Sequence, residues 1–181
     1  MGYAGGTKKA PTYHSLGDHT ETFEVDFDPK KIAYERLLEM FFAAHDPHAR
    51  AWSTQYKPAV FHRGEAQERA AKAMRDAIAA RAGKPVKTEI LPFTGFTRAE
   101  DYHQKYYLQQ HAGLTAEIRD RYPSFCGFVD STAAARLNGY VGGHGTSGDV
   151  ERDLPRLGLS KASGEKLLAE ARRERPGPAC K

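Results

Sequence analysis

Apolar and polar residues alternate along two short stretches of the chain, residues 23–27 and 86–90. An alternation with a period of two places the apolar side chains on one face of an extended backbone, so each stretch predicts a β-strand. Residues 57–62 predict a further strand, with Ala59 and Phe61 on one face and Val60 on the other.

Apolar residues at helical spacing predict two helices between these strands. The first begins at Asp28, a good N-cap that is followed by proline, and it ends near His45. The second covers about residues 66–78 and closes at Gly83, since glycine readily adopts the left-handed conformation that ends helices. Strands and helices in this alternating order predict an α+β fold with helices packed on a sheet. If a further strand and helix precede Met1, the unit has a ferredoxin-like split βαβ arrangement.

The C-terminal part of the chain is predicted to be mainly helical. Thr97 and Glu100 have capping-box spacing, which predicts a helix from there to about Gln110. Shorter helices are expected over about residues 114–122 and 131–138. Further leucines indicate a small helical element near the end, before a tail rich in proline, glycine and arginine.

Length and composition limit the classes of protein to consider. The 181 residues have room for one α+β domain, expected at residues 1–127, and a helical extension with a disordered tail at residues 128–181. No apolar run approaches the ~18 residues of a membrane span, and no export leader is recognisable. The two cysteines, Cys126 and Cys180, form no Cys-x-x-Cys pair, so we expect a protein of the reducing cytoplasm.

Neither the charge distribution nor the spacing of potential ligand residues indicates a nucleic-acid or metal site. The net charge is only +4, and much of the basic excess lies in the C-terminal tail rather than in a stripe with interleaved aromatic residues. No spacing of His, Cys, Asp and Glu resembles a metal-ligand set. We therefore expect neither a nucleic-acid partner nor a bound metal.

The densest group of ionisable and phenolic residues is Glu100-Asp101-Tyr102-His103. Taken by itself, such a cluster at a predicted helix N-terminus is explained by capping and by the helix dipole. Its meaning changes when it is compared with the rest of the chain. Short motifs precede it in a fixed order: Gly2-Tyr3-Ala4-Gly5-Gly6, Pro11-Thr12-Tyr13, His19-Thr20-Glu21, Phe27-Asp28-Pro29, Phe41-Phe42, His45-Asp46-Pro47 and Thr54-Gln55-Tyr56.

This ordered set, over about residues 2–108, resembles the peptide methionine sulfoxide reductase A family. The resemblance implies reduction of the S-epimer of methionine sulfoxide, free or in proteins, as a repair of oxidative damage. It also implies a monomer without a bound cofactor, which thioredoxin returns to the reduced state.

The resemblance assigns roles to individual residues. Glu21 would donate a proton to the sulfoxide oxygen, which is a poor leaving group until it is protonated. Tyr3 and Tyr56 would hydrogen-bond the same oxygen, and residues 100–103 would frame the site. A thiolate would attack the sulfur and end as a sulfenic acid. Taken singly, each of these residues also fits an ordinary structural role.

Two departures from the family pattern affect the expected activity. The family nucleophile lies in a Gly-Cys-Phe-Trp motif ahead of the Gly-Tyr-x-Gly-Gly turn, and the 181 residues do not contain it. We expect the sequence to be incomplete at its N-terminus, with a cysteine or selenocysteine in the missing part, and the chain as given to have little or no activity. Ala51 also occupies the position of a family aspartate.

The two cysteines leave alternatives open. The apolar surroundings of Cys126 favour a buried structural thiol over a replacement nucleophile. Cys180 lies in the tail, where the family often has a recycling cysteine, but an ordinary surface thiol fits equally well. The alternative function is a non-catalytic module, or pseudoenzyme, that binds sulfoxides without turnover.

Overall fold

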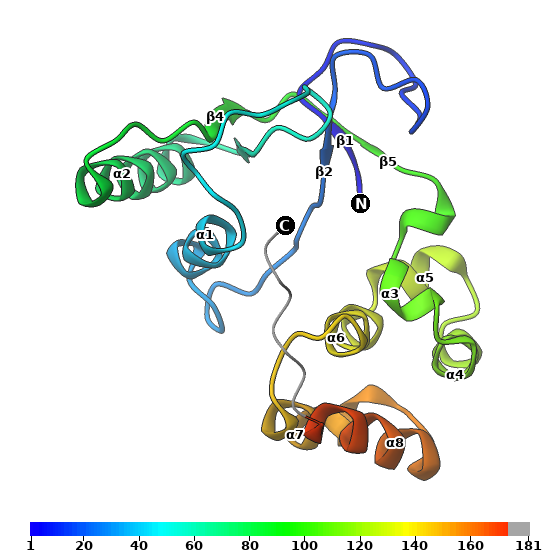
Figure 1. Cartoon of the computed structure of the whole chain (residues 1–181). Helices are drawn as coiled ribbons and strands as arrows, with labels where there is room; N and C mark the ends of the chain where they lie inside the picture. Colours follow the sequence, from blue (N-terminus) through cyan, green and yellow to red (C-terminus); the bar gives the residue numbers. More distant parts are fainter. Residues whose placement is uncertain (174–181) are drawn as a thin grey trace. The chain divides into compact units, whose positions relative to one another are not determined.

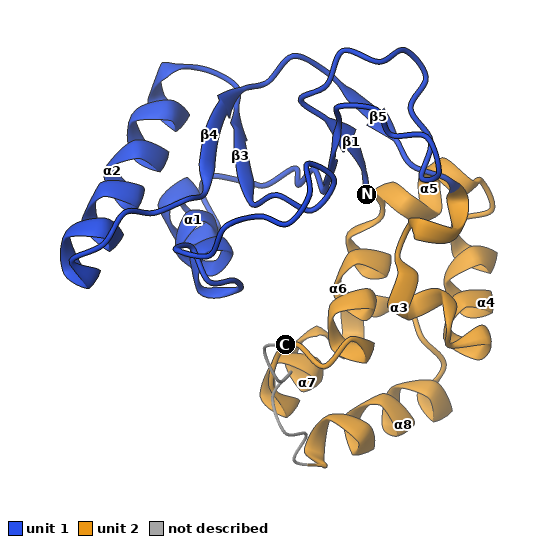
Figure 2. Ribbon diagram, turned by 45° about the horizontal axis from the view of Figure 1, so that its top comes forward, with its two compact units in different colours: residues 1–100 blue, residues 101–181 orange. Residues whose placement is uncertain are grey.

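A computed structural model describes residues 1–173 of the chain. The described backbone forms two compact units, one over Met1–Glu100 and one that begins at Asp101, shown in separate colours in Figure 2. Each unit has a buried apolar cluster of its own. This division into compact units does not test the domain boundary expected after residue 127, and that boundary stays a prediction.

Three short strands of the first unit form an antiparallel sheet (Figure 1). β1 (Gly2–Ala4) lies in the middle, with β2 (Thr20–Thr22) on one side and β5 (Phe96–Arg98) on the other. The register places Tyr3 directly opposite Glu21. Opposite residues of an antiparallel pair share one face of the sheet, so these two side chains are neighbours.

A parallel strand pair forms the other half of this unit. β3 (Ala59–His62) and β4 (Glu89–Pro92) are connected by α2 (Glu65–Ala82), which makes a βαβ unit. α1 (Tyr34–Ala43) packs against α2. Gly83 ends α2 with a φ of 64°, as its position predicted. The predictions of two strands and a long helix in this region are confirmed, with ends shifted by a few residues.

The strand predicted at residues 23–27 is wrong. These residues follow β2 without a strand partner among the described residues, and the side chains of Phe23 and Val25 are 64% and 52% exposed. Alternation determines which side chains could share a face. A strand also needs a neighbouring backbone that supplies its hydrogen bonds, and the sequence pattern does not show whether one is present.

The predicted helix start at Asp28 is also wrong. α1 begins at Tyr34, and the Asp28 carboxylate instead accepts a hydrogen bond of 2.9 Å from the backbone N–H of Lys30. Asp28 therefore stabilises a turn ahead of the helix, which is the other common use of an aspartate side chain.

The continuous helix predicted from Thr97 to Gln110 is replaced by three shorter elements. They are β5, a 3₁₀ turn η1 (Asp101–His103) and a short helix α3 (Tyr106–Gln109). Pairing with β1 holds Thr97 in an extended conformation, and this tertiary contact overrides the local capping signal.

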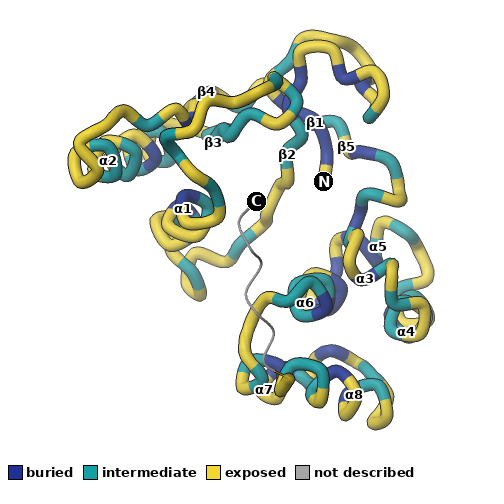
Figure 3. The backbone as a smooth tube through the Cα atoms, viewed as in Figure 1, coloured by how far each residue is buried: buried dark blue, intermediate teal, exposed yellow. Residues whose placement is uncertain are grey.

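The described part of the second unit is helical. After η1 and α3 it continues with α4 (Ala112–Arg121), α5 (Phe125–Asp130), α6 (Thr132–Val141), α7 (Ser147–Leu157) and α8 (Lys161–Arg172). Its core is dark in Figure 3 and includes Leu108, Ile118, Phe128, Leu137 and Leu157, all fully buried. The predicted α+β class with a helical C-terminal part is confirmed. Among the described residues, no helix combines the length and the apolar character that a membrane span requires.

Candidate active site

Glu21 is held at both its backbone and its side chain by one glutamine. Its backbone N–H donates to the carbonyl of Gln55 at 2.9 Å, and its carboxylate Oε1 accepts from Gln55 Nε2 at 2.6 Å. The residue is half-buried on β2. Gln55 therefore fixes the direction of the carboxyl group while leaving its second oxygen, Oε2, outside this contact.

Two phenol groups adjoin this carboxyl group. Gln55 Nε2 also donates to the hydroxyl of Tyr56 at 3.1 Å, and the hydroxyls of Tyr56 and Tyr13 lie 3.3 Å apart. The hydrogen bond with Tyr13, together with partial burial and the negative charge of Glu21, raises the pKa of Tyr56 to about 12. Tyr56 is therefore a neutral hydrogen-bond donor over the whole physiological pH range.

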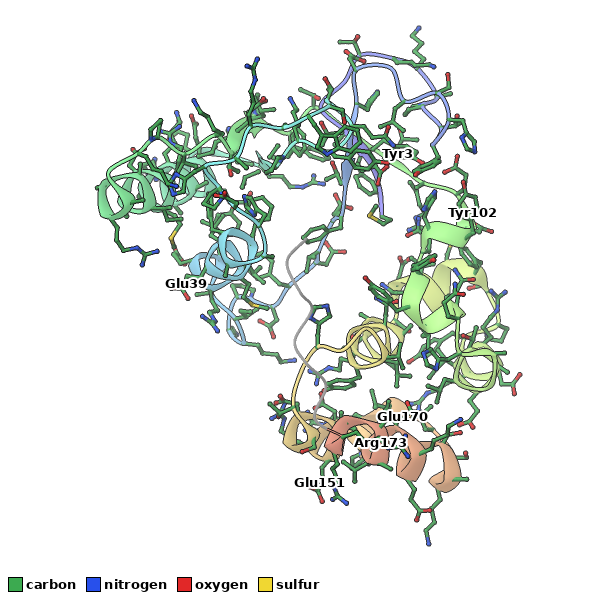
Figure 4. The ribbon with its side chains drawn as sticks, viewed as in Figure 1. Tyr3, Glu39, Tyr102, Glu151, Glu170 and Arg173 are labelled. Carbon is green, nitrogen blue, oxygen red and sulfur yellow. The ribbon has the colours of Figure 1, made fainter. Side chains whose placement is uncertain are left out.

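A second carboxylate, Glu100, connects β1 with the loop that follows it. Its Oε2 accepts from the hydroxyl of Tyr3 at 2.6 Å, and its Oε1 accepts from the backbone N–H of Tyr13 at 3.0 Å. Tyr3 is 1% exposed and lies among the side chains of the antiparallel sheet, where Figure 4 labels it. Glu100 thereby fixes Tyr13, which in turn reaches Tyr56.

The loop between β1 and β2 is closed by a buried histidine. His19 Nδ1 accepts from the backbone N–H of Gly6 at 3.3 Å, and its Nε2 lies 2.9 Å from the carbonyl oxygen of Lys8. The two contacts fit a neutral ring that carries its proton on Nε2. Gly5 in the same loop has a φ of 78°, and a Cβ there would lie 2.5 Å from the ring of Phe61. The loop therefore leads directly into β2, which contains Glu21.

Comparison with known proteins identifies the family. A family model described as peptide methionine sulfoxide reductase matches residues 1–124. The chain belongs to the peptide methionine sulfoxide reductase family. The match includes the whole first unit, and therefore every residue of the network around Glu21.

Individual reductases are similar over different lengths. The peptide methionine sulfoxide reductase of Drosophila melanogaster is 35% identical over 88% of this chain and 65% of its own length. The MsrA of Acidobacterium capsulatum is 40% identical over 65% of this chain and 81% of its own length. The structure of Mxr1 from Saccharomyces cerevisiae in reduced form has a TM-score of 0.55 at 27% identity, over 61% of this chain and 69% of that one. The chain thus spans less than two thirds of the Drosophila relative.

The structure gathers most of the predicted reductase residues into one network. Glu21, Tyr56 and Glu100 are connected through hydrogen bonds, and Tyr3 joins them through Glu100. Their roles in reduction stay predictions. The hydroxyl of Tyr3 donates to Glu100, and Tyr3 is 1% exposed.

The other predicted site residues lie in the second unit. Asp101, Tyr102 and His103 form η1, in which the rings of Tyr102 and His103 are 4.2 Å apart. Their framing role stays a prediction. Among the described residues, no group of three or more His, Cys, Asp and Glu side chains could hold a metal.

The interpretation of Cys126 as a buried thiol is wrong. Cys126 is exposed on α5, because the helix directs its neighbours Phe128 and Val129 toward the core instead. Cys180 lies outside the described residues, so its predicted recycling role is unchanged.

Sequence reasoning gave no role to three residues that the structure adds. Gln55 joins Glu21 to Tyr56, and Tyr13 joins Tyr56 to Glu100. The ring of Trp52 stacks on Tyr56 with centroids 4.8 Å apart. Tyr13 and Gln55 lie within motifs that contributed to the family resemblance, which was the available signal. Trp52 belongs to no such motif.

Proposed function

We propose that this chain provides the sulfoxide-binding site of a peptide-methionine (S)-S-oxide reductase, which reduces methionine S-sulfoxide, free or in proteins, as a repair of oxidative damage. The observation that carries the proposal is the pairing of the Glu21 carboxyl with the neutral Tyr56 phenol through Gln55. One group can supply a proton while the other donates a hydrogen bond, and both can reach a single oxygen atom.

The reaction assigns a part to each group. A sulfoxide oxygen accepts the Tyr56 hydroxyl proton as a hydrogen bond, and Glu21 in its protonated form transfers a proton to it. A thiolate attacks the sulfur, and the oxygen moves to the thiolate sulfur. The products are a thioether and a sulfenic acid, so methionine gains the electron pair that the thiol loses. Thioredoxin then reduces the sulfenic acid, and water leaves as thioredoxin forms its disulfide.

The nucleophile is the part of this scheme that the 181 residues do not supply through a family motif, because Gly-Cys-Phe-Trp does not occur in them. We therefore expect the chain as given to bind methionine sulfoxide with little turnover. A cysteine or selenocysteine in that motif would provide full activity.

Binding tests the proposal directly. Isothermal titration calorimetry of the full chain with L-methionine S-sulfoxide and with methionine should show binding of the sulfoxide only. Tyr56→Phe should weaken that binding about tenfold, since a donor to the oxygen is lost. Tyr34→Phe, which removes a phenol from α1, is the matched control. Equal binding of sulfoxide and methionine, or of neither, refutes the proposal.

Binding without turnover is the second candidate, because the family motif Gly-Cys-Phe-Trp does not occur in the 181 residues. Cys126 is the one cysteine among the described residues, and it is exposed on α5. An assay with dithiothreitol as reductant tests this second candidate. Methionine formation that disappears in Cys126→Ser would identify a replacement nucleophile and refute it.

A further inference from the structure

Trp52 is a large aromatic side chain beside the site that the proposed reaction leaves unused. It is the single tryptophan of the chain, and it is 81% exposed. Its ring stacks on that of Tyr56, with an interplanar angle of 30° and a centroid separation of 4.8 Å. Offset stacking of this kind orients both rings.

The position of Trp52 relative to Tyr56 gives the indole a defined neighbour. The hydroxyl of Tyr56 contacts Tyr13 and Gln55, while the indole of Trp52 stacks on the Tyr56 ring. A sulfoxide oxygen that accepts from the Tyr56 hydroxyl is therefore held next to the indole. The atoms that extend from that sulfoxide group can pass over an apolar surface that is open to solvent.

We propose that Trp52 is a specificity-determining residue that binds the side chain adjacent to methionine sulfoxide in a polypeptide. The proposal rests on the proposed function and adds a preference for protein-bound over free substrate. It commits to one occupant of the indole surface, an apolar residue that flanks the oxidised methionine.

The chemistry of the two substrate forms supports this choice. Free methionine sulfoxide carries a charged amino group and a charged carboxylate, which have little to gain from an apolar surface. In a polypeptide both charges are replaced by amides, and the chain continues with side chains on either side. An exposed indole offers such a side chain a large rigid apolar contact at a low cost in conformational entropy.

The single tryptophan makes the contact measurable. Intrinsic fluorescence of the full chain should shift on addition of a short peptide with leucines on both sides of methionine sulfoxide, because only Trp52 reports. The free amino acid and the same peptide with unoxidised methionine should give a much smaller shift. Calorimetry should show tighter binding of the oxidised peptide than of free methionine sulfoxide.

Variants separate this proposal from the proposed function. Trp52→Ala should weaken peptide binding about tenfold and leave the affinity for free methionine sulfoxide within a factor of about two. Trp52→Phe should restore most of the peptide affinity. Met40→Ala, which removes an exposed apolar side chain from α1, is the control and should change neither affinity.

The outcomes are distinct. Equal peptide affinity in Trp52→Ala and the unmodified chain overturns the role of Trp52 while the proposed function stands. An equal loss of affinity for both ligands in Trp52→Ala also overturns it, because the indole would then act only by supporting Tyr56. No binding of either ligand by the unmodified chain refutes the proposed function and this proposal together.

Discussion

At the scale of single residues, the site depends on one glutamine that contacts three groups. The backbone carbonyl of Gln55 accepts from the backbone N–H of Glu21, and its side-chain amide donates to the Glu21 carboxyl group and to the Tyr56 hydroxyl. The amide therefore decides where the proton donor and the phenol point relative to each other.

Replacement of this amide should uncouple the two groups. Gln55→Ala removes both side-chain bonds but keeps the backbone bond to Glu21, so we expect the affinity for methionine sulfoxide to fall about tenfold. Calorimetry measures the effect. Gln67→Ala is the matched control, because Gln67 makes an exposed contact with the backbone of Arg63 in the same unit. Equal affinity in the two variants would show that Gln55 does not organise the site.

The titration of Tyr56 is a second residue-scale prediction. Its pKa is raised to about 12, first by the hydrogen bond with Tyr13. Ultraviolet difference spectra between the unmodified chain and Tyr56→Phe should show one phenol that ionises near pH 12. In Tyr13→Phe that step should move to lower pH, whereas Tyr106→Phe, at an exposed position, should leave it in place. A step that stays in place in Tyr13→Phe would contradict the assigned cause.

The sign of the associated stability change follows from linkage. The folded chain holds the Tyr56 proton more tightly than the unfolded chain, whose tyrosines titrate near 10. This contribution to stability is fully present below pH 10 and is lost as pH rises through about 12.

At the scale of elements, short-range caps and loop contacts stabilise the strands and helices that surround the core. Asp18 is the clearest case in the first unit. Its carboxylate accepts from the backbone N–H and the hydroxyl of Thr7 and from the backbone N–H of Lys8. These bonds lower its pKa from 3.8 to about 2, and they close the loop between β1 and β2.

Acid should open this loop. The stabilisation from Asp18 is present above the unfolded pKa of about 4 and is lost as pH falls toward 2. Thermal unfolding followed by circular dichroism at pH 5 and at pH 2 should show a smaller acid-induced loss in Asp18→Asn than in the unmodified chain. Asp76→Asn, which changes an exposed carboxylate on α2, is the control and should leave the acid-induced loss unchanged.

In the second unit, α7 begins with a complete capping box. The Thr146 hydroxyl accepts from the backbone N–H of Asp149, and the Asp149 carboxylate accepts from the backbone N–H of Thr146. Thr146→Ala should lower the free energy of unfolding by about 1 kcal/mol, whereas Thr146→Ser should cost much less. Urea denaturation of the two variants provides the comparison. Equal stability would show that the cap contributes nothing.

At the scale of the whole molecule, each unit has its own apolar cluster. Leu137 is completely buried in the cluster of the second unit, and Leu16 is 6% exposed in the cluster of the first. Truncation of either leaves a cavity in the cluster that surrounds it. The two residues therefore permit a symmetrical test of how far each cluster stabilises its own unit.

Leu137→Ala should lower the free energy of unfolding of the second unit by about 2–5 kcal/mol. Hydrogen exchange with mass spectrometry should locate the lost protection within residues 101–173. Leu16→Ala should lose protection within residues 1–100 instead. If either variant loses protection evenly over both units, the two clusters do not stabilise their units separately.

The sequence by itself determined the features that depend on local periods and signals. The patterns over residues 57–62 and 66–78 predicted β3 and α2, and Gly83 predicted the end of that helix. The ordered motifs named Tyr3, Glu21, Tyr56 and Glu100 as a set. The strand, the helix and each single motif are encoded in residues close together in the chain, where spacing and side-chain type suffice.

The tertiary structure alone decided which backbone segments pair and which side chains meet. Residues 23–27 have the alternation of a strand but no strand partner among the described residues, and Thr97 has a capping signal but pairs with β1. The bond between Tyr13 and Glu100 spans 87 positions of the chain, and no local pattern encodes it. Long-range hydrogen bonds and stacking, including that of Trp52 on Tyr56, depend on where the whole chain places each residue.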